Sequence, residues 1–391
     1  MGYVLPCPHI KCGARFAHEE SAPRMPPTEN VEDVVFTRVD TKRIITLNRP
    51  GALNALNLSM IRKIYPKMTK YEAETDEDID FVILKGQGDR AFCAGGDVRA
   101  VAESGMARKA GKVSKLTEDF FREEYMLDYL IGTFKVPFIS LMNGITMGGG
   151  VGLSVHGTFR VATEKTIFAM PETAIGLFPD VGGSFFLPRL HGNLGMFLAL
   201  TGYRLSGSDV RHSGIATHFV DSHQLPELEK QLLVMPHGRC DSNSIGLVLS
   251  EFESRSTLNH TDFSLEPHLS EIEHLFVGDS VEQICENLSK GSSWAKEKKE
   301  ELLKMSPTSC KIAHRQIKLG KNLDLKSCFQ MEYRISQRCM EGHDFFEGVR
   351  ATLIDKDKNP KWKPGSLSEV SNADIDKYFD NLPEERELRL A

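Results

Sequence analysis

Two glycine-rich turns are the clearest sign of chemistry in this sequence. The first reads Ala-Gly-Gly-Asp at residues 94–97, and the second reads Met-Gly-Gly-Gly-Val-Gly at residues 147–152. Each follows a strand-like apolar run and precedes a helix-like segment. Glycine lets backbone N–H groups reach a surface without a Cβ atom in the way. Two such turns facing one point predict an oxyanion hole, which stabilises negative charge on a carbonyl oxygen.

Two carboxyl groups lie further along the chain, on either side of a mostly apolar segment. Glu172 directly follows Pro171 at the end of a strand-like run, and Asp180 comes eight residues later. Low polarity raises the pKa of a carboxyl group toward neutrality, where it can act as a nucleophile or a general base. The alternative is that Glu172 only stabilises the first turn of a following helix. At this point both interpretations stay open.

A third acid, Glu124, lies in the aromatic segment Phe-Phe-Arg-Glu-Glu-Tyr at residues 120–125. On a helix, Phe121 and Glu124 share a face, so Glu124 is expected near the apolar side while Glu123 points elsewhere. The alternative is an ordinary solvated charge on a helix surface.

Two other patterns are weaker than they first look. Ser154 and His156 suggest a serine hydrolase, but histidine stands where the nucleophile elbow needs its second glycine, and residues two apart on a helix face apart. We therefore expect buried polar roles for both. The 148–152 glycine run lacks the closing Gly-Lys of a phosphate-binding loop, which disfavours a nucleotide site.

Alternating patterns predict the elements that position these residues. Strands are expected at 43–48, 81–84, 138–142, 159–162 and 167–170, and helices at 58–71, 118–134 and 149–156. Residues 101–117 are expected to form a mobile loop or loose helix. The pattern predicts an α/β fold with helices covering the sheet. Residues 136–159 lack charge, but Pro137 and the glycines are incompatible with a bilayer helix.

Composition narrows the function class. The 391 residues carry a net charge of −6, with 48 basic and 54 acidic residues interleaved, which does not favour nucleic acid or an anionic membrane as a partner. The eight cysteines form no Cys-x-x-Cys pair, a pattern of reduced thiols rather than of disulfides or a zinc site. We expect a disordered or targeting segment at 1–33, a core with the active site at 34–221, and a mainly helical region at 222–380.

Several motifs together resemble the crotonase (enoyl-CoA hydratase/isomerase) superfamily over roughly residues 35–365. They are RIITLNRPGALNAL (43–56), AFCAGGDV (91–98), NGITMGGGVG (143–152), FAMPETAIGLFPDVGG (168–183) and LTGYRL (200–205). A further set is similar to the branch of 3-hydroxyisobutyryl-CoA hydrolases: FFREEYML (120–127), GLSVHG (152–157), MSPTS (305–309), MEYR (331–334) and GHDFFEGVRATLIDKDKNPKW (342–362).

The resemblance implies a crotonase-like fold of repeated β-β-α units with C-terminal helices. It implies an acyl-CoA thioester as substrate, with the oxyanion hole made by the N–H groups of Gly96 and Gly149. Coenzyme A is then part of the substrate, and neither a separate cofactor nor a metal is expected. The resemblance also implies a location in the mitochondrial matrix and is compatible with a homo-oligomer.

One departure from the superfamily bears on the reaction. Hydratases place a glutamate where this chain has Gly152, and commonly a glycine where it has Asp180. The resemblance therefore implies hydrolysis of a short hydroxyacyl-CoA, with Glu172 as the catalytic acid, acting as nucleophile or general base. Asp180 and Glu124 are expected to bind the acyl hydroxyl and orient Glu172. The rival hypotheses are a hydratase or isomerase of the same superfamily, and a catalytically silent acyl-CoA-binding protein.

Overall fold

The computed structural model describes residues 32–73, 79–257 and 262–390. The predicted disordered or targeting segment, 1–33, lies outside these ranges except for its last two residues. Residues 33–391 form one compact unit. Within it, helices of the 222–380 region pack directly against helices of the 34–221 core.

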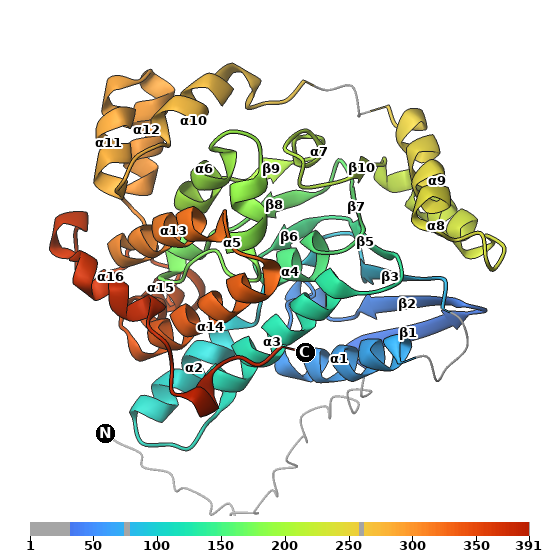
Figure 1. Ribbon diagram of the computed structural model, residues 1–391, viewed down its shortest axis with the longest axis horizontal. Coiled ribbons are helices and arrows are strands. Elements are labelled where there is room, and N and C mark those ends of the chain that lie inside the picture. Colours follow the sequence, from blue (N-terminus) through green and yellow to red (C-terminus); the bar gives the residue numbers. More distant parts are fainter. Residues whose placement is uncertain (1–31, 74–78, 258–261, 391) are drawn as a thin grey trace, which may run out of the picture. The chain divides into compact units, whose positions relative to one another are not determined.

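Two sheets form the centre of this unit (Figure 1). The six-stranded sheet has the order β1-β2-β3-β5-β7-β10, and the four-stranded sheet has the order β4-β6-β8-β9. Strands pair in parallel except for β1 with β2 and β8 with β9. The strands are β1 (Val34–Val39), β2 (Lys42–Leu47), β3 (Phe81–Gly86), β4 (Ala91–Cys93), β5 (Phe138–Met142), β6 (Ile145–Met147), β7 (Phe159–Ala162), β8 (Ile167–Ala169), β9 (Leu205–Ser206) and β10 (His218–Phe219).

The chain repeats one unit in which a strand of the first sheet is followed by a strand of the second and then by a helix. Three such units run β3-β4-α2, β5-β6-α4 and β7-β8-η2, the last ending in a short 3-10 helix. This confirms the predicted crotonase-like α/β class. Because β4, β6 and β8 are neighbours in parallel, the turns that follow them meet along one edge of the four-stranded sheet.

Alternation along the buried strands builds a separate core on each face of the six-stranded sheet. In β5, Phe138 and Met142 belong to one apolar core, whereas Ile139 and Leu141 belong to the other. Successive side chains of a strand point to opposite faces, so a strand covered on both sides reads as a continuous apolar run. The apolar segment 136–159 is therefore strand and buried helix, as predicted, and no helix among the described residues is long and apolar enough to cross a membrane.

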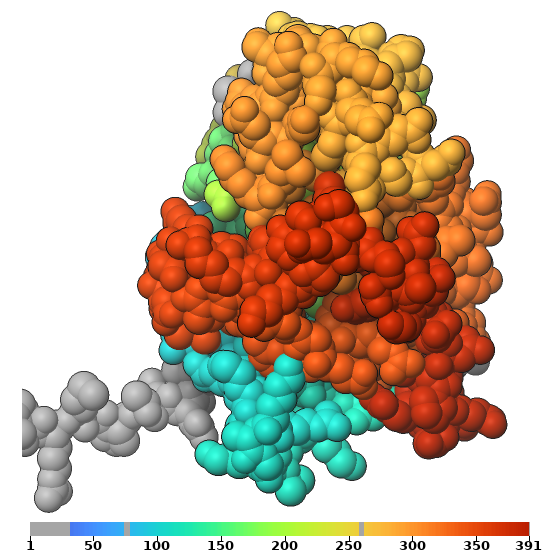
Figure 2. All heavy atoms as spheres, turned by 90° about the vertical axis from the view of Figure 1, so that its left-hand side faces the viewer, coloured from blue at the N-terminus to red at the C-terminus, as the bar shows by residue number. Residues whose placement is uncertain are grey.

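Helices cover both faces of the sheets. They are α1 (Leu58–Glu72), α2 (Val98–Lys109), α3 (Leu116–Thr133), α4 (Gly149–Val155), α5 (Gly183–Phe186), α6 (Leu194–Thr201), α7 (Asp209–His212), α8 (Leu225–Leu233), α9 (Ser242–Arg255), α10 (Leu269–Leu275), α11 (Val281–Lys290), α12 (Ser293–Leu302), α13 (Pro307–Gly320), α14 (Leu325–Glu341), α15 (Asp344–Val349) and α16 (Asn372–Phe379). Helices α8 and α9 cover one face of the large sheet. Figure 2 shows the C-terminal region, orange to red, spread over the face that also exposes α2 in cyan.

The predicted helix at 58–71 illustrates why local signals succeed here. Asn57 accepts a hydrogen bond from the Met60 N–H at 2.8 Å and so caps the first turn of α1. Ile61, Ile64 and Met68 are buried on one face, at helical spacing. Of the two alternatives for 101–117, a mobile loop or a loose helix, the structure has a helix to Lys109, and this helix, α2, packs on α3.

Candidate active site

The two glycine turns lie side by side, as their paired strands require. Gly95 and Gly148 have φ of 116° and 45°, conformations that favour glycine. A Cβ atom placed on Gly149 would lie 3.2 Å from the Gly96 nitrogen, so the two glycines of the predicted oxyanion hole are neighbours. Neither N–H takes part in a hydrogen bond among the described residues. The turns therefore present two adjacent backbone donors, as an oxyanion hole needs.

Backbone pairing holds the first turn rigidly. The Leu56 N–H donates to the Gly95 carbonyl at 2.8 Å, and the Asp97 N–H donates to the Leu56 carbonyl at 2.7 Å. These two bonds pass on either side of the Gly96 N–H and leave it free. The segment after β2 thus fixes one donor of the hole, while the start of α4 fixes the other.

Glu172 lies against the second turn. Its Oε1 is 3.0 Å from the place of a Cβ atom on Gly148, and its Oε2 is buried without a hydrogen-bond partner among the described residues. Glu172 begins the short 3-10 helix η2 (Glu172–Ile175). The residue before this helix, Pro171, makes no capping side-chain hydrogen bond. Burial, and then the charge of Asp180, raises the pKa of Glu172 well above its usual range. A buried carboxyl group with a raised pKa and one oxygen unpartnered among the described residues, beside two free N–H groups, is suited to attack a carbonyl or to deprotonate water.

Glu124 reaches the same place from the opposite side, on α3. Its Oε1 lies 2.4 Å from the place of a Cβ atom on Gly149 and is buried without a partner among the described residues. Only a glycine at position 149 leaves room for this carboxyl group. Glu123, by contrast, points outward and bonds Arg62, as the helical spacing predicts. Glu124 is therefore part of the site and not a solvated helix charge.

Asp180 is held by a residue that the sequence analysis did not single out. The hydroxyl of Tyr125, which follows Glu124 on α3, donates to Asp180 Oδ2 at 2.8 Å. Burial raises the pKa of Asp180 to about 7, while this hydrogen bond lowers it. Tyr125 is completely buried. Its hydroxyl thus fixes the direction of the Asp180 carboxyl group and moderates its basicity.

The loop that carries Asp180 is braced by two C-terminal helices, α13 and α14. Glu332 of α14 accepts hydrogen bonds from the Gly182 N–H at 2.7 Å and from the Ser184 N–H at 2.8 Å. Gln316 of α13 donates to the Pro179 carbonyl at 2.6 Å. These contacts hold a strained segment in place, since Val181 has a φ of 50°. The C-terminal helices therefore position the catalytic loop.

Ser154 and His156 have the buried polar roles that the sequence predicts. The Ser154 hydroxyl donates to the Gly150 carbonyl within α4 at 2.9 Å. Nε2 of His156 lies 2.8 Å from the Val181 carbonyl oxygen, so this nitrogen must donate. Burial lowers the pKa of His156 to about 4, which leaves the ring neutral. The pair forms no Ser–His nucleophile.

A carboxyl group from another helix lies beside Gly152. Oδ2 of Asp128, one turn beyond Glu124 on α3, lies 2.4 Å from the place of a Cβ atom on Gly152. The glycine at position 152 therefore does not leave this place without a carboxyl group. A carboxyl group does stand where a side chain at position 152 would point, but it comes from another helix. Sequence alone showed Glu124 and Asp128 at helical spacing, yet nothing placed them against α4.

Acids dominate the electrostatics of the site. Burial raises the pKa of Glu124 well above its usual range, and the charges of Asp180, Asp128 and Glu172 raise it further. Burial likewise raises the pKa of Glu332 to about 8. Burial and mutual repulsion therefore keep some of these acids protonated at neutral pH, so that they do not all carry a charge at once. Among the described residues no three His, Cys, Asp or Glu side chains are arranged to hold a metal ion.

Comparison with known proteins places the chain in a family. The model of the enoyl-CoA hydratase/isomerase family matches residues 42–379. The chain belongs to this family. The enoyl-CoA hydratase/isomerase signature thus spans both sheets and the C-terminal helices that brace the Asp180 loop. Family membership agrees with the oxyanion geometry at Gly96 and Gly149.

Relatives of the chain refine the comparison. It is 55% identical to a Danio rerio protein over 92% of both chains, and 52% identical to a Homo sapiens protein over 91% of this chain and 90% of the other. Both are named 3-hydroxyisobutyryl-CoA hydrolase, mitochondrial. Two solved structures are more distant but similar in fold. A carnitinyl-CoA dehydratase from Mycobacterium thermoresistibile has a TM-score of 0.81 at 33% identity, covering 92% of this chain and 98% of its own. An enoyl-CoA hydratase from Rhodobacter sphaeroides has a TM-score of 0.79 at 31% identity, covering 92% and 100%.

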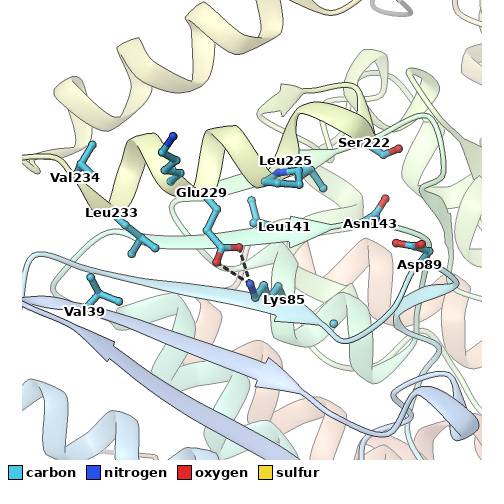
Figure 3. Close-up of a pocket in the computed structure, with 13 residues that line it drawn as sticks. Val39, Lys85, Asp89, Leu141, Asn143, Ser222, Leu225, Glu229, Leu233 and Val234 are labelled. Atoms are coloured by element: carbon cyan, nitrogen blue, oxygen red, sulfur yellow. Dashed lines mark hydrogen bonds and ion pairs between the residues drawn. The ribbon is translucent and has the colours of Figure 1, made fainter.

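A separate cavity of about 510 Å³ lies between α8 and the large sheet (Figure 3). Its lining does not include Glu124, Glu172 or Asp180. Lys85 of β3 and Glu229 of α8 face each other across it and form an ion pair at 2.6 Å. These two charged groups are thus paired with each other, unlike the acids of the site.

Proposed function

We propose that the chain hydrolyses the thioester of a short hydroxyacyl-CoA, namely 3-hydroxyisobutyryl-CoA, to 3-hydroxyisobutyrate and free coenzyme A. This reaction belongs to valine catabolism. The observation that carries the proposal is the buried, unpartnered Oε2 of Glu172 beside the free N–H groups of Gly96 and Gly149. The names of the two relatives support the acyl group, and we propose the same mitochondrial location.

In the proposed mechanism the thioester carbonyl oxygen sits between the N–H groups of Gly96 and Gly149. Glu172 either attacks the carbonyl carbon, giving an anhydride that water opens, or removes a proton from a water that attacks directly. In both versions the C–S bond breaks and the oxyanion is stabilised by the same two donors. Removing one such donor typically raises the barrier by about 3 kcal/mol.

Asp180 and Glu124 are proposed to contact the acyl group. We propose that Asp180, oriented by Tyr125, binds the 3-hydroxyl and that Glu124 orients Glu172. The hydrogen bond from Tyr125 supports the first role, and the approach of Glu124 and Glu172 to the adjacent glycines Gly149 and Gly148 supports the second. If Asp180→Asn shows the same preference for 3-hydroxyisobutyryl-CoA over isobutyryl-CoA as the wild type, this role of Asp180 is wrong. Coenzyme A enters as part of the substrate, and the absence of a separate cofactor or metal stays a prediction, as does self-association.

A second candidate, hydration of an enoyl-CoA, is favoured by one specific observation. Asp128 supplies a carboxyl group at the place of a side chain on Gly152, so two acids flank the Gly149 turn. The solved relatives titled as a dehydratase and a hydratase are consistent with such chemistry in this fold. Substantial loss of the crotonyl-CoA double bond in the presence of the wild-type chain would favour this candidate.

The proposal is tested by thiol release from a panel of short acyl-CoAs. We expect the wild type to release free coenzyme A fastest from 3-hydroxyisobutyryl-CoA. Isobutyryl-CoA serves as the matched substrate without the hydroxyl. Binding of acyl-CoA without thiol release would instead identify a silent acyl-CoA-binding protein and contradict the proposal.

A further inference from the structure

Asp128 is a completely buried acid to which the mechanism above gives no task. Its side chain lies in α3 with no exposed surface, and neither Oδ1 nor Oδ2 contacts a hydrogen-bond donor of the described residues. Buried carboxyl groups in proteins are almost always hydrogen-bonded or paired. A buried aspartate without a hydrogen-bond partner needs a polar ligand, and the described residues do not provide one.

Asp128 of α3 lies against Gly152 of α4. Glu124 and Asp128 are four residues apart on one face of α3, and Gly149 and Gly152 are three apart on the facing side of α4. A Cβ atom on either glycine would fall 2.4 Å from an oxygen of the facing acid. The two carboxyl groups therefore occupy the spaces that side chains at positions 149 and 152 would fill; we call these two spaces the glycine notches. Gly149 belongs to the oxyanion hole, and Gly152 lies about 4.5 Å further along the helix.

The surroundings of Asp128 favour its uncharged form. The acids that face it are Glu124 on the same helix, Asp180 in the catalytic loop and Glu332 on α14; the thiol of Cys93 on β4 lies on the same side. Burial, and then the charges of Asp180 and Glu332, raises the pKa of Asp128 well above its usual range. A protonated carboxyl group both donates and accepts a hydrogen bond, as a ligand with a hydroxyl group requires.

We propose that Asp128 is a positioning residue that holds a buried water molecule, together with Oε1 of Glu124, and supplies it for thioester cleavage. This rests on the proposed function, because hydrolysis consumes one water. In net terms the water oxygen forms the new C–O bond to the acyl carbon and the C–S bond breaks. One water proton passes through the carboxyl groups to the thiolate sulfur.

Water fits this place better than the acyl group does. Along α4, Gly149 and the facing Oε1 of Glu124 come first, and Gly152 with the facing Oδ2 of Asp128 lies nearly one turn further on. Val181 also borders the place beside Gly152, since its Cβ is 2.8 Å from the place of a Cβ atom on that glycine. Two other buried oxygens without partners among the described residues, Oε1 of Glu124 and Oε2 of Glu172, belong to side chains that lie against Gly149 and Gly148.

The kinetic test compares two variants of nearly the same size. Asp128→Leu removes both hydrogen-bonding groups, and Asp128→Asn retains one donor and one acceptor. We expect Asp128→Leu to lower kcat at least tenfold on both 3-hydroxyisobutyryl-CoA and isobutyryl-CoA, with KM within twofold of the wild type. Asp128→Asn is expected to recover kcat to within about threefold of the wild type.

A matched control separates this effect from the general removal of a buried acid. Asp221 is also buried and has an unpartnered Oδ1, but its other oxygen bonds Thr257 and it lies outside the site. Asp221→Asn should leave kcat and KM unchanged. A loss in Asp128→Leu confined to the hydroxylated substrate assigns Asp128 to the acyl hydroxyl and overturns the water proposal. An unchanged kcat, or a rise in KM alone, also overturns it.

A crystal structure of the wild-type chain tests the water directly, even if Asp128→Leu does not fold. Density for a water within 3.2 Å of an Asp128 oxygen is expected, and a dry notch at high resolution overturns the proposal. Failure of the wild type to release thiol from any acyl-CoA would contradict the proposed function instead. The density at Asp128 would still decide whether the water site exists.

Discussion

The acid site and the cavity under α8 use charge in opposite ways. In the cavity, Glu229 is partly exposed and its charge is met by Lys85 at 2.6 Å. In the site, Glu124 and Glu172 are buried, and each keeps an oxygen that has no partner in the described part of the chain. A paired surface carboxylate is an ordinary structural feature, whereas unpaired buried carboxyl groups destabilise the fold and are retained where chemistry uses them. The comparison therefore assigns function to the acids and not to the cavity under α8.

The largest effect is expected from a side chain added at Gly149, in the oxyanion hole. Gly149→Ala places a Cβ atom 2.4 Å from Glu124 Oε1 and forces that carboxyl group or the turn to move. We expect kcat for thiol release to fall about 10²- to 10³-fold, since a displaced donor acts like a lost one. The control is Gly246→Ala in α9, where the new Cβ makes only a 3.7 Å contact with Phe159. Equal activity of the two variants would contradict the placement of the oxyanion hole.

A smaller effect is expected from the hydrogen bond that orients Asp180. Tyr125→Phe removes the hydroxyl that donates to Oδ2 and lowers the pKa of Asp180, so the pKa should rise above about 7. We expect a roughly tenfold or greater loss of kcat/KM, with the pH–rate midpoint moved to higher pH. Tyr129→Phe, on the same helix but packed by its ring on Phe329, is the control. A pH profile identical to the wild type would show that Tyr125 does not act on Asp180.

The buried acids should also make the free energy of unfolding depend on pH. Folding raises the pKa of Asp180 to about 7 and of Glu332 to about 8, so the folded state binds more protons between pH 4 and 8. The contribution of these two groups to stability is therefore greatest below about pH 4, falls as the pH rises toward about 7 and 8, on the order of 1 kcal/mol per group per pH unit, and levels off above their folded pKa values. Urea unfolding from pH 5 to 8 measures this, and Asp128→Asn should flatten the slope. A stability that rises over this range would contradict the protonated cluster.

The smallest effect belongs to the paired charges of the cavity. Glu229→Gln removes a partly exposed ion pair, so the free energy of unfolding should fall by no more than about 1 kcal/mol. Thiol release should be unchanged within error. A clear loss of activity in this variant would link the cavity to catalysis and weaken the distinction drawn above.

Much of the site could be predicted from the sequence because it rests on local signals. The glycine turns that place Gly96 and Gly149 follow buried strands, and Glu172 follows Pro171 where a strand ends. The helical spacing also separated Glu124 from Glu123. The turns and the helix faces depend on neighbours within a few residues, whereas the resemblance to crotonases assigned the two donors to Gly96 and Gly149.

The rest depends on packing between distant segments. The contact of Asp128 with Gly152 joins α3 to α4, and the bracing of the Asp180 loop by Glu332 spans 150 residues between Gly182 and Glu332. Periodicity cannot show which helix faces which. Two signals were present nonetheless: a glycine in a buried helix often makes room for a neighbour, and Glu332 lies in a motif that the sequence analysis had already singled out.

The central claim, that Glu172 cleaves a thioester in this site, is tested most directly by Glu172→Gln. This change keeps the size of the side chain and removes its ability to act as nucleophile or base. With 3-hydroxyisobutyryl-CoA as substrate, we predict that coenzyme A thiol release falls at least about 10³-fold while the variant stays folded. Thiol release by Glu172→Gln at the wild-type rate would contradict the account.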